Sequence, residues 1–99
     1  MNKVLLHNIQ LCLSHAPVQK AWLFGSFARN EEIAESDIDI LVEFISGTKI
    51  SLFDYGAIVY DLEQTTGRKI DLVQESMLKS FARKSVEHDK VLIYERTTA

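Results

Sequence analysis

The chain has 99 residues, of which 46% are hydrophobic, and this length predicts one small domain spanning residues 1–99. Acidic residues outnumber basic ones by 14 to 11, so the sequence lacks the broad positive field that would hold nucleic acid non-specifically. The single cysteine, Cys12, excludes an internal disulfide, and polar residues interrupt the apolar N-terminal stretch, which excludes a signal peptide and a membrane span. We therefore expect a cytoplasmic protein.

The first half of the chain is predicted to hold two helices and two strands. Apolar residues recur at helical spacing across residues 3–15, and Pro17 ends that helix. The apolar run 21–24 and the alternating stretch 37–44 both favour strands, and residues 26–32 between them indicate one or two helical turns. The apolar stripe of the first helix consists of Val4, Leu5, Ile9, Cys12 and Leu13.

The second half repeats the alternation. Ser51 and Asp54 resemble a capping box that opens a helix, and Gly67 is placed to end it. Its apolar stripe consists of Leu52, Tyr55, Val59 and Leu62. A strand over 69–73, a helix over 77–88 and a strand over 91–94 complete the order. This order predicts the α/β class, with helices packed on a small mixed β-sheet.

Two carboxylates share one face of a predicted strand. Asp37 and Asp39 are two residues apart, so their side chains point the same way from Cα atoms about 6.6 Å apart. Ile38 and Ile40 lie on the opposite face, where burial would fix the register. Two adjacent carboxylates repel each other unless a cation neutralises them, and oxygen ligands suit Mg²⁺ or Mn²⁺.

An isolated pair of this kind is more often a solvated feature of an edge strand than a metal site. The surrounding residues favour a site. Gly25 and Ser26 follow a strand and open a helix, where free N–H groups and the helix dipole attract an anion, and Arg29 adds positive charge one turn later. Asp71 lies in a strand short enough to sit beside that of Asp37; on its own it would be taken for an exposed strand carboxylate.

These segments together resemble a known family. The run Gly25 to Arg29 (GSFAR), followed by Ser36 to Asp39 (SDID), is similar to the signature of the DNA polymerase beta-like nucleotidyltransferases, and most of all to the minimal nucleotidyltransferases. The stretches 70–73 and 91–95 also resemble that branch. One departure is Asn30, where the family often has Gly; Asn tolerates the left-handed backbone that this position can require.

The resemblance implies a nucleotidyltransferase-like fold and a set of roles. Asp37, Asp39 and Asp71 would be catalytic and would bind two Mg²⁺ or Mn²⁺ ions, with Asp71 also activating the acceptor. The triphosphate of ATP or another NTP would be held by Gly25 and Ser26, helped by Arg29. It further implies transfer of AMP to a protein hydroxyl, on a helical partner of the HEPN toxin type that the chain would neutralise as an antitoxin.

Two other functions stay open from the sequence: a binding module that blocks its partner by contact alone, and nucleotidylation of a small molecule such as an aminoglycoside. The acceptor, the preferred base and the oligomeric state are left undetermined. Tyr55 and Tyr60 fall at helical spacing typical of a core or an interface. The basic residues of the last predicted helix, Lys79, Arg83 and Lys84, are read as a solvated face, with a docking surface as the alternative.

Overall fold

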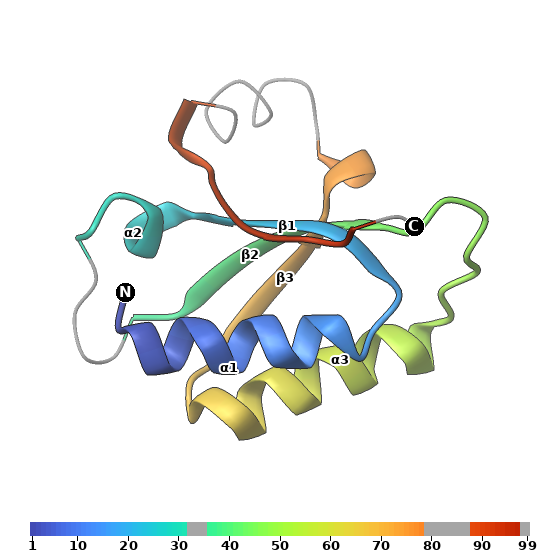
Figure 1. Cartoon of the computed structure of the whole chain (residues 1–99), viewed down its shortest axis with the longest axis horizontal. Coiled ribbons are helices and arrows are strands. Elements are labelled where there is room, and N and C mark those ends of the chain that lie inside the picture. The colour runs from blue at the N-terminus through green and yellow to red at the C-terminus, as the bar shows by residue number, and fades with distance from the viewer. Residues whose placement is uncertain (32–35, 79–87, 98–99) are drawn as a thin grey trace.

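The computed structural model describes residues 1–31, 36–78 and 88–97, which form a sheet covered by two long helices on one face (Figure 1). The elements in chain order are α1 (Lys3–Ser14), β1 (Val18–Phe24), α2 (Gly25–Ala28), β2 (Ile38–Phe44), α3 (Leu52–Thr66), β3 (Ile70–Gln74), η1 (Glu75–Met77) and β4 (Val91–Glu95). Figure 1 shows α1 and α3 below the sheet and η1 above it. Within the described ranges, no helix has the length and apolar content needed to cross a membrane.

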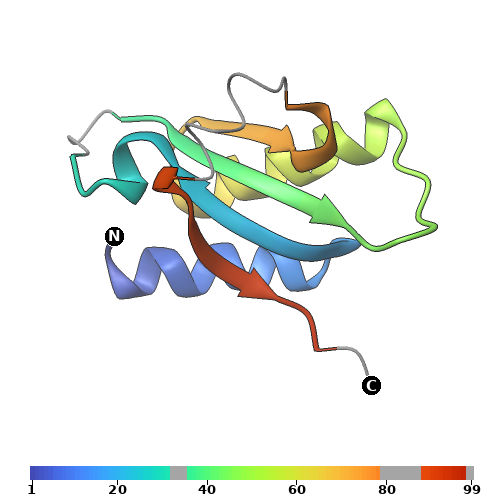
Figure 2. The same cartoon turned by 90° about the horizontal axis from the view of Figure 1, so that it is seen from above.

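The sheet has four strands in the order β3-β2-β1-β4, which Figure 2 shows from above. Strand β2 runs parallel to β3, whereas β1 is antiparallel to both β2 and β4. The mixed sheet predicted from the sequence is therefore confirmed. Because β2 is an inner strand, it is hydrogen-bonded on both sides and its register is fixed by two neighbours.

The core lies between the sheet and the two long helices. Alternate residues of β2 point into it, and Ile38, Ile40 and Val42 are fully buried. The helices contribute Ile9 and Leu13 from α1 and Leu62 from α3, also fully buried. Each such aliphatic side chain contributes roughly 1.5–3 kcal/mol when removed from water. This burial fixes the face of β2 on which Asp39 lies.

Local signals in the sequence set the bounds of both long helices. The Asn2 side chain accepts hydrogen bonds from the backbone N–H groups of Val4 (2.7 Å) and Leu5 (3.3 Å) and caps α1. Ser51 and Asp54 form the predicted capping box of α3. Gly67 ends that helix, as predicted, and does so with a left-handed φ of 67°.

Several predicted details are wrong. Val4 is 67% exposed and Leu52 is 85% exposed, so neither belongs to the core. Both lie in the first turns of their helices, and periodicity identifies an apolar face without showing how much of its length the sheet covers. Strand β1 begins at Val18, three residues earlier than predicted, and α2 ends at Ala28. The predicted helix 77–88 falls largely on residues 79–87, outside the described residues, and its first residue belongs to η1 instead.

Candidate functional site

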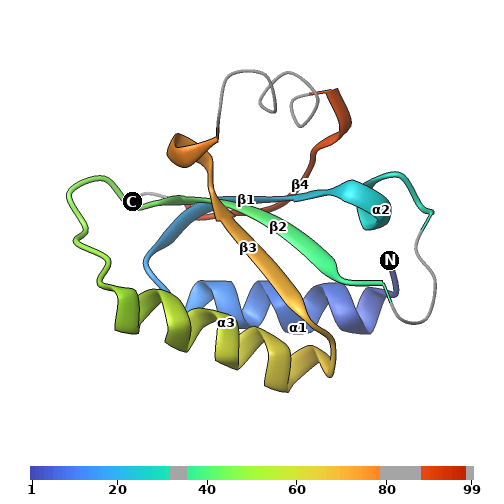
Figure 3. The same ribbon diagram turned by 180° about the vertical axis from the view of Figure 1, so that it is seen from behind.

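Two of the predicted carboxylates lie side by side on the sheet. Asp39 of β2 is paired in register with Asp71 of the parallel strand β3, so both side chains leave the same face on strands about 4.8 Å apart. Figure 3 shows β3 beside β2 on this side of the molecule. The alternative that Asp39 sits on an edge strand is wrong, because β2 is flanked by β1 and β3. Asp37 is exposed and is the residue directly before β2.

The charges of this group act on one another. Partial burial raises the pKa of Asp39, and the negative charges of Asp71 and Asp37 raise it further. A hydrogen bond with Asp71, donated by the protonated Asp39 carboxyl, acts in the same direction, whereas the positive charge of Arg29 lowers the pKa. The fold therefore disfavours the ionised form of Asp39, and a nearby cation would offset that cost.

Gly25, directly after β1, lies very close to the Asp39 carboxylate. Phe24, the last residue of β1, pairs with Asp39 across the antiparallel ladder. Gly25 follows with a φ of 69°, and a Cβ atom built on it would overlap the Asp39 carboxylate oxygen Oδ2. Only glycine satisfies both the left-handed backbone and the close approach. The turn that the sequence predicts to hold phosphate therefore touches a carboxylate that it predicts to hold metal.

Buried and cationic side chains fix the short helix after this turn. Phe27 is only 4% exposed, and the Arg68 guanidinium lies over its ring, 5.4 Å from the centroid. Arg68 Nη1 also donates a hydrogen bond to the carbonyl of Ser36 (3.4 Å), just before Asp37. Arg68 thus links the two halves of the site, and sequence reasoning missed it because it lies 32 residues from Ser36. Asn30 adopts a φ of 56°, so this position does take the left-handed backbone that Asn tolerates.

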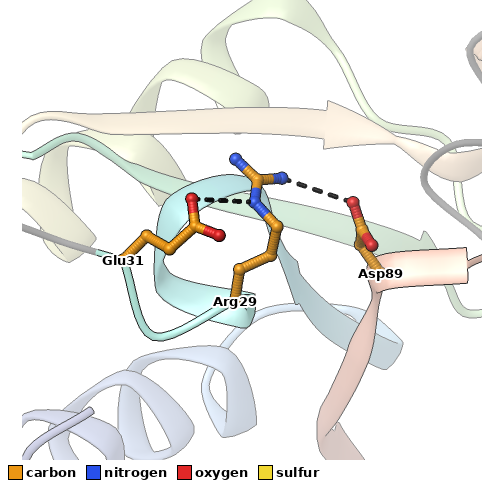
Figure 4. Close-up of polar contacts among 3 residues, drawn as sticks. All are labelled: Arg29, Glu31 and Asp89. Atoms are coloured by element: carbon orange, nitrogen blue, oxygen red, sulfur yellow. Dashed lines mark hydrogen bonds and ion pairs between the residues drawn. The ribbon is translucent and has the colours of Figure 1, made fainter.

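Arg29 lies at the end of α2, where its side chain meets two acids (Figure 4). Its Nε is 3.4 Å from Glu31 Oε2, and its Nη1 is 3.3 Å from Asp89 Oδ2. The hydrogen bond to Glu31 is the main reason that the pKa of Arg29 is raised, and Asp89 adds to it. Because Arg29 also lowers the pKa of Asp39, its charge acts on the carboxylate pair.

Tyr55 is a second residue that the sequence did not assign to the site. It is half-buried on α3, as expected for a core or interface residue. Burial raises the pKa of its hydroxyl, and the negative charge of Asp71 raises it further. No local pattern could reveal this proximity, because it depends on how α3 packs against β3.

The carboxylate pair fits a hard divalent cation. Within the described residues, no three His, Cys, Asp or Glu side chains converge into a ready-made metal cage. Mg²⁺ commonly binds through one or two carboxylates together with water and substrate phosphates, so an adjacent pair is a sufficient protein contribution. Asp39 and Asp71 are paired in register and their side chains interact, and Gly25 places no side chain against Asp39, so the arrangement matches that requirement.

Comparison with known proteins identifies the family. The family model described as "Polymerase beta, Nucleotidyltransferase" matches residues 7–99. The chain belongs to this family. Among relatives of this nucleotidyltransferase, the protein adenylyltransferase MntA of Thermococcus cleftensis is 37% identical over 76 residues, covering 77% of this chain and 75% of the relative. A proposed protein adenylyltransferase of Methanocaldococcus jannaschii is 35% identical over 91 residues, covering 92% and 95% of the two chains.

Solved structures agree with this assignment. A structure described as a minimal nucleotidyltransferase matches with a TM-score of 0.66 and 31% identity, covering 88% of this chain and 86% of that one. The fold is also that of the MNT antitoxin in complex with a tri-AMPylated HEPN toxin of Shewanella oneidensis, with a TM-score of 0.73 and 18% identity over 97% of this chain and 74% of that one. The fold class predicted from the sequence is therefore confirmed, and the chain is an enzyme of the nucleotidyltransferase class.

Proposed function

We propose that this nucleotidyltransferase uses divalent metal to move AMP, or another nucleoside monophosphate, from a nucleoside triphosphate to a hydroxyl of a HEPN-type helical protein. The observation that carries the proposal is the contact of the Gly25 turn with Asp39, which is itself paired with Asp71. A phosphate-binding turn and a metal-binding carboxylate pair are the two parts that nucleotidyl transfer requires. We place the activity in the cytoplasm, where the triphosphate is available and a lone cysteine stays reduced.

Each predicted site residue has a role in this proposal. Backbone N–H groups at Gly25 and Ser26, where a helix begins and intrahelical acceptors are lacking, hold the triphosphate, and Arg29 adds positive charge. Asp37, Asp39 and Asp71 would hold two Mg²⁺ or Mn²⁺ ions. When bound, these ions neutralise charge on the phosphates and favour the ionised acceptor oxygen.

The transfer step is a substitution at the α-phosphorus. The acceptor hydroxyl oxygen forms a bond to the α-phosphorus, the bond from that phosphorus to the bridging oxygen breaks, and pyrophosphate leaves with the electron pair. The hydroxyl proton must go to a base, and we assign this role to Asp71, whose carboxylate is exposed on the edge strand β3. A hydroxyl on a large partner can reach an exposed carboxylate on an edge strand more easily than it can reach a carboxylate on an inner strand.

Relatives and structural neighbours support the partner class. The Thermococcus relative is named a protein adenylyltransferase, and the Shewanella complex pairs an MNT antitoxin with a HEPN toxin that carries AMP groups. We extend this pairing to the present chain and propose an antitoxin role, in which adenylylation neutralises the partner.

The test is to incubate the protein with ATP, Mg²⁺ and the HEPN-type protein encoded beside its gene, and to measure the partner's mass. We expect a gain of one or more adenylyl groups. The Asp37→Ala and Asp39→Ala variants should each slow the gain at least about a hundredfold, which corresponds to about 2.7 kcal/mol of transition-state stabilisation. Asp71→Ala should slow transfer while affecting nucleotide affinity less.

Glu43→Ala is the matched control. Glu43 is an exposed acid of β2 on the face of Asp39, but it lies four residues further along, about 13 Å away. Glu43→Ala changes the net charge by the same amount as each Asp→Ala variant. It should leave the transfer rate within about twofold of that of the unmodified protein, because Glu43 is too far away to contact the same ion. If the Asp37→Ala, Asp39→Ala double variant neutralises the partner as well as the unmodified protein and the partner never gains mass, neutralisation works by contact alone.

A further inference from the structure

Asp89 reaches the candidate nucleotide site from the far end of the chain. It lies two residues before β4, and its Oδ2 atom is 3.3 Å from Nη1 of Arg29, a residue 60 positions earlier. Glu31 holds the Nε atom of the same guanidinium at 3.4 Å. Figure 4 shows the guanidinium between the two carboxylates.

Asp89 is the better placed of the two acids. Its side chain is 25% exposed, compared with 64% for Glu31. The chain that follows it is also held: β4 pairs with β1, and the Lys90 ammonium lies over the Trp22 ring, 4.5 Å from the centroid. A carboxylate on a fixed segment restricts the guanidinium more than one on an exposed turn does.

We propose that Asp89 is a positioning residue for the nucleotide: it holds the Arg29 guanidinium beside the Gly25 turn, where it can meet the triphosphate. The inference rests on the proposed function, since it requires a triphosphate at that turn. A long arginine side chain loses rotamer freedom when it binds a ligand, and a side chain already restrained loses less. Surface ion pairs contribute little to folding stability, so the effect of Asp89 should be seen in nucleotide binding rather than in melting.

The experiment measures binding of a non-hydrolysable ATP analogue with Mg²⁺ by calorimetry. The Asp89→Asn variant should raise the dissociation constant about fivefold, a modest loss in keeping with one partly exposed ion pair. The Asp89→Glu variant keeps a carboxylate and should restore most of the affinity. In turnover, Asp89→Asn should raise KM for ATP with kcat nearly unchanged.

A double-variant cycle shows whether Asp89 acts through Arg29. Arg29→Ala should weaken binding by itself, and adding Asp89→Asn to Arg29→Ala should cause no further loss. Glu95→Gln is the matched control, because it breaks a similar exposed pair between β1 and β4, Lys20 Nζ to Glu95 Oε2 at 3.5 Å, without touching Arg29. Its dissociation constant should equal that of the unmodified protein.

The outcomes separate the two claims. If the unmodified protein binds no nucleotide, the proposed function is wrong and this inference is wrong with it. If Arg29→Ala weakens binding but Asp89→Asn does not, only the role of Asp89 is wrong. Tighter binding by Asp89→Asn would also overturn it, since Asp89 would then be withholding Arg29 from the phosphates. Equal losses in the presence and absence of the Arg29 side chain would show that Asp89 acts by another route.

Discussion

The two faces of the sheet differ in what strand β2 contributes to them: buried isoleucines on one, and the Asp39 carboxylate on the other. On the face covered by α1 and α3, Ile38 and Ile40 of β2 are fully buried. Between them in sequence, Asp39 points to the other face and meets Asp71 of β3. A register slip of one residue would exchange the two sets, so the burial of the isoleucines holds the acids in place. Packing on one face is therefore a condition for chemistry on the other.

The largest expected effect comes from the covered face. Ile40→Ala removes a fully buried side chain from the centre of the core and should lower the free energy of unfolding by about 2–5 kcal/mol. Chemical denaturation measures the loss. Nucleotide affinity should fall only in proportion to the unfolded fraction, and a loss of affinity in fully folded protein would show that the two faces are coupled more tightly than packing requires.

The next effect comes from the Gly25 turn, which lies against Asp39. Gly25→Ala places a Cβ against Asp39 at a φ of 69° and should lower stability by more than the roughly 1–2 kcal/mol that the left-handed backbone alone costs. Gly67→Ala is the matched control, because its φ is 67° and no atom lies within 4 Å of the added Cβ. Only Gly25→Ala should also abolish nucleotide binding. Equal losses in both variants would mean that the contact with Asp39 has no energetic weight.

A smaller effect belongs to the helical layer alone. The Ser51 side chain accepts a hydrogen bond from the Asp54 N–H at 3.1 Å, and Ser51→Ala removes this cap from α3. The free energy of unfolding should fall by about 1 kcal/mol. Nucleotide affinity, measured well below the melting temperature, should not change, which would separate damage to the helices from damage to the site.

The smallest effect tests the electrostatics of the polar face. Because the pKa of Asp39 is raised in the folded state, its contribution to stability is fully present below its unfolded pKa and is lost as pH rises through the folded value. At neutral pH without metal, Asp39→Asn should therefore have a slightly higher melting temperature than the parent. The gain in the free energy of unfolding should be about 1 kcal/mol or less, given solvent screening. The difference should shrink as the buffer is made acidic. A lower melting temperature at neutral pH would indicate a structural role for Asp39.

The sequence predicted most reliably what depends on neighbouring residues. The capping box at Ser51, the helix end at Gly67 and the alternation around Asp39 are local patterns, and all three are confirmed. The sequence also predicted that the strand of Asp71 could lie beside that of Asp37, and this adjacency is confirmed; the register that pairs Asp39 with Asp71 is known only from the structure.

What the sequence did not predict depends on long-range packing. Leu52 has a core pattern but lies exposed, since periodicity does not show where a helix extends past the sheet. Arg68 and Asp89 contact the site from 32 and 60 residues away, and nothing beside them in the chain marks the contact. The metal and phosphate roles of Asp37, Ser26 and the other site residues stay predictions.

The most direct test of the site is the binding of a non-hydrolysable ATP analogue with and without Mg²⁺, in the unmodified protein and in Asp39→Asn. If the carboxylate pair and the Gly25 turn form one site, metal and nucleotide together should raise the melting temperature strongly. With the nucleotide at about a hundred times its dissociation constant, the free energy of unfolding should rise by about 2.7 kcal/mol. Asp39→Asn should lose the part of this gain that depends on Mg²⁺. A melting curve that neither ligand shifts, alone or together, would contradict the account.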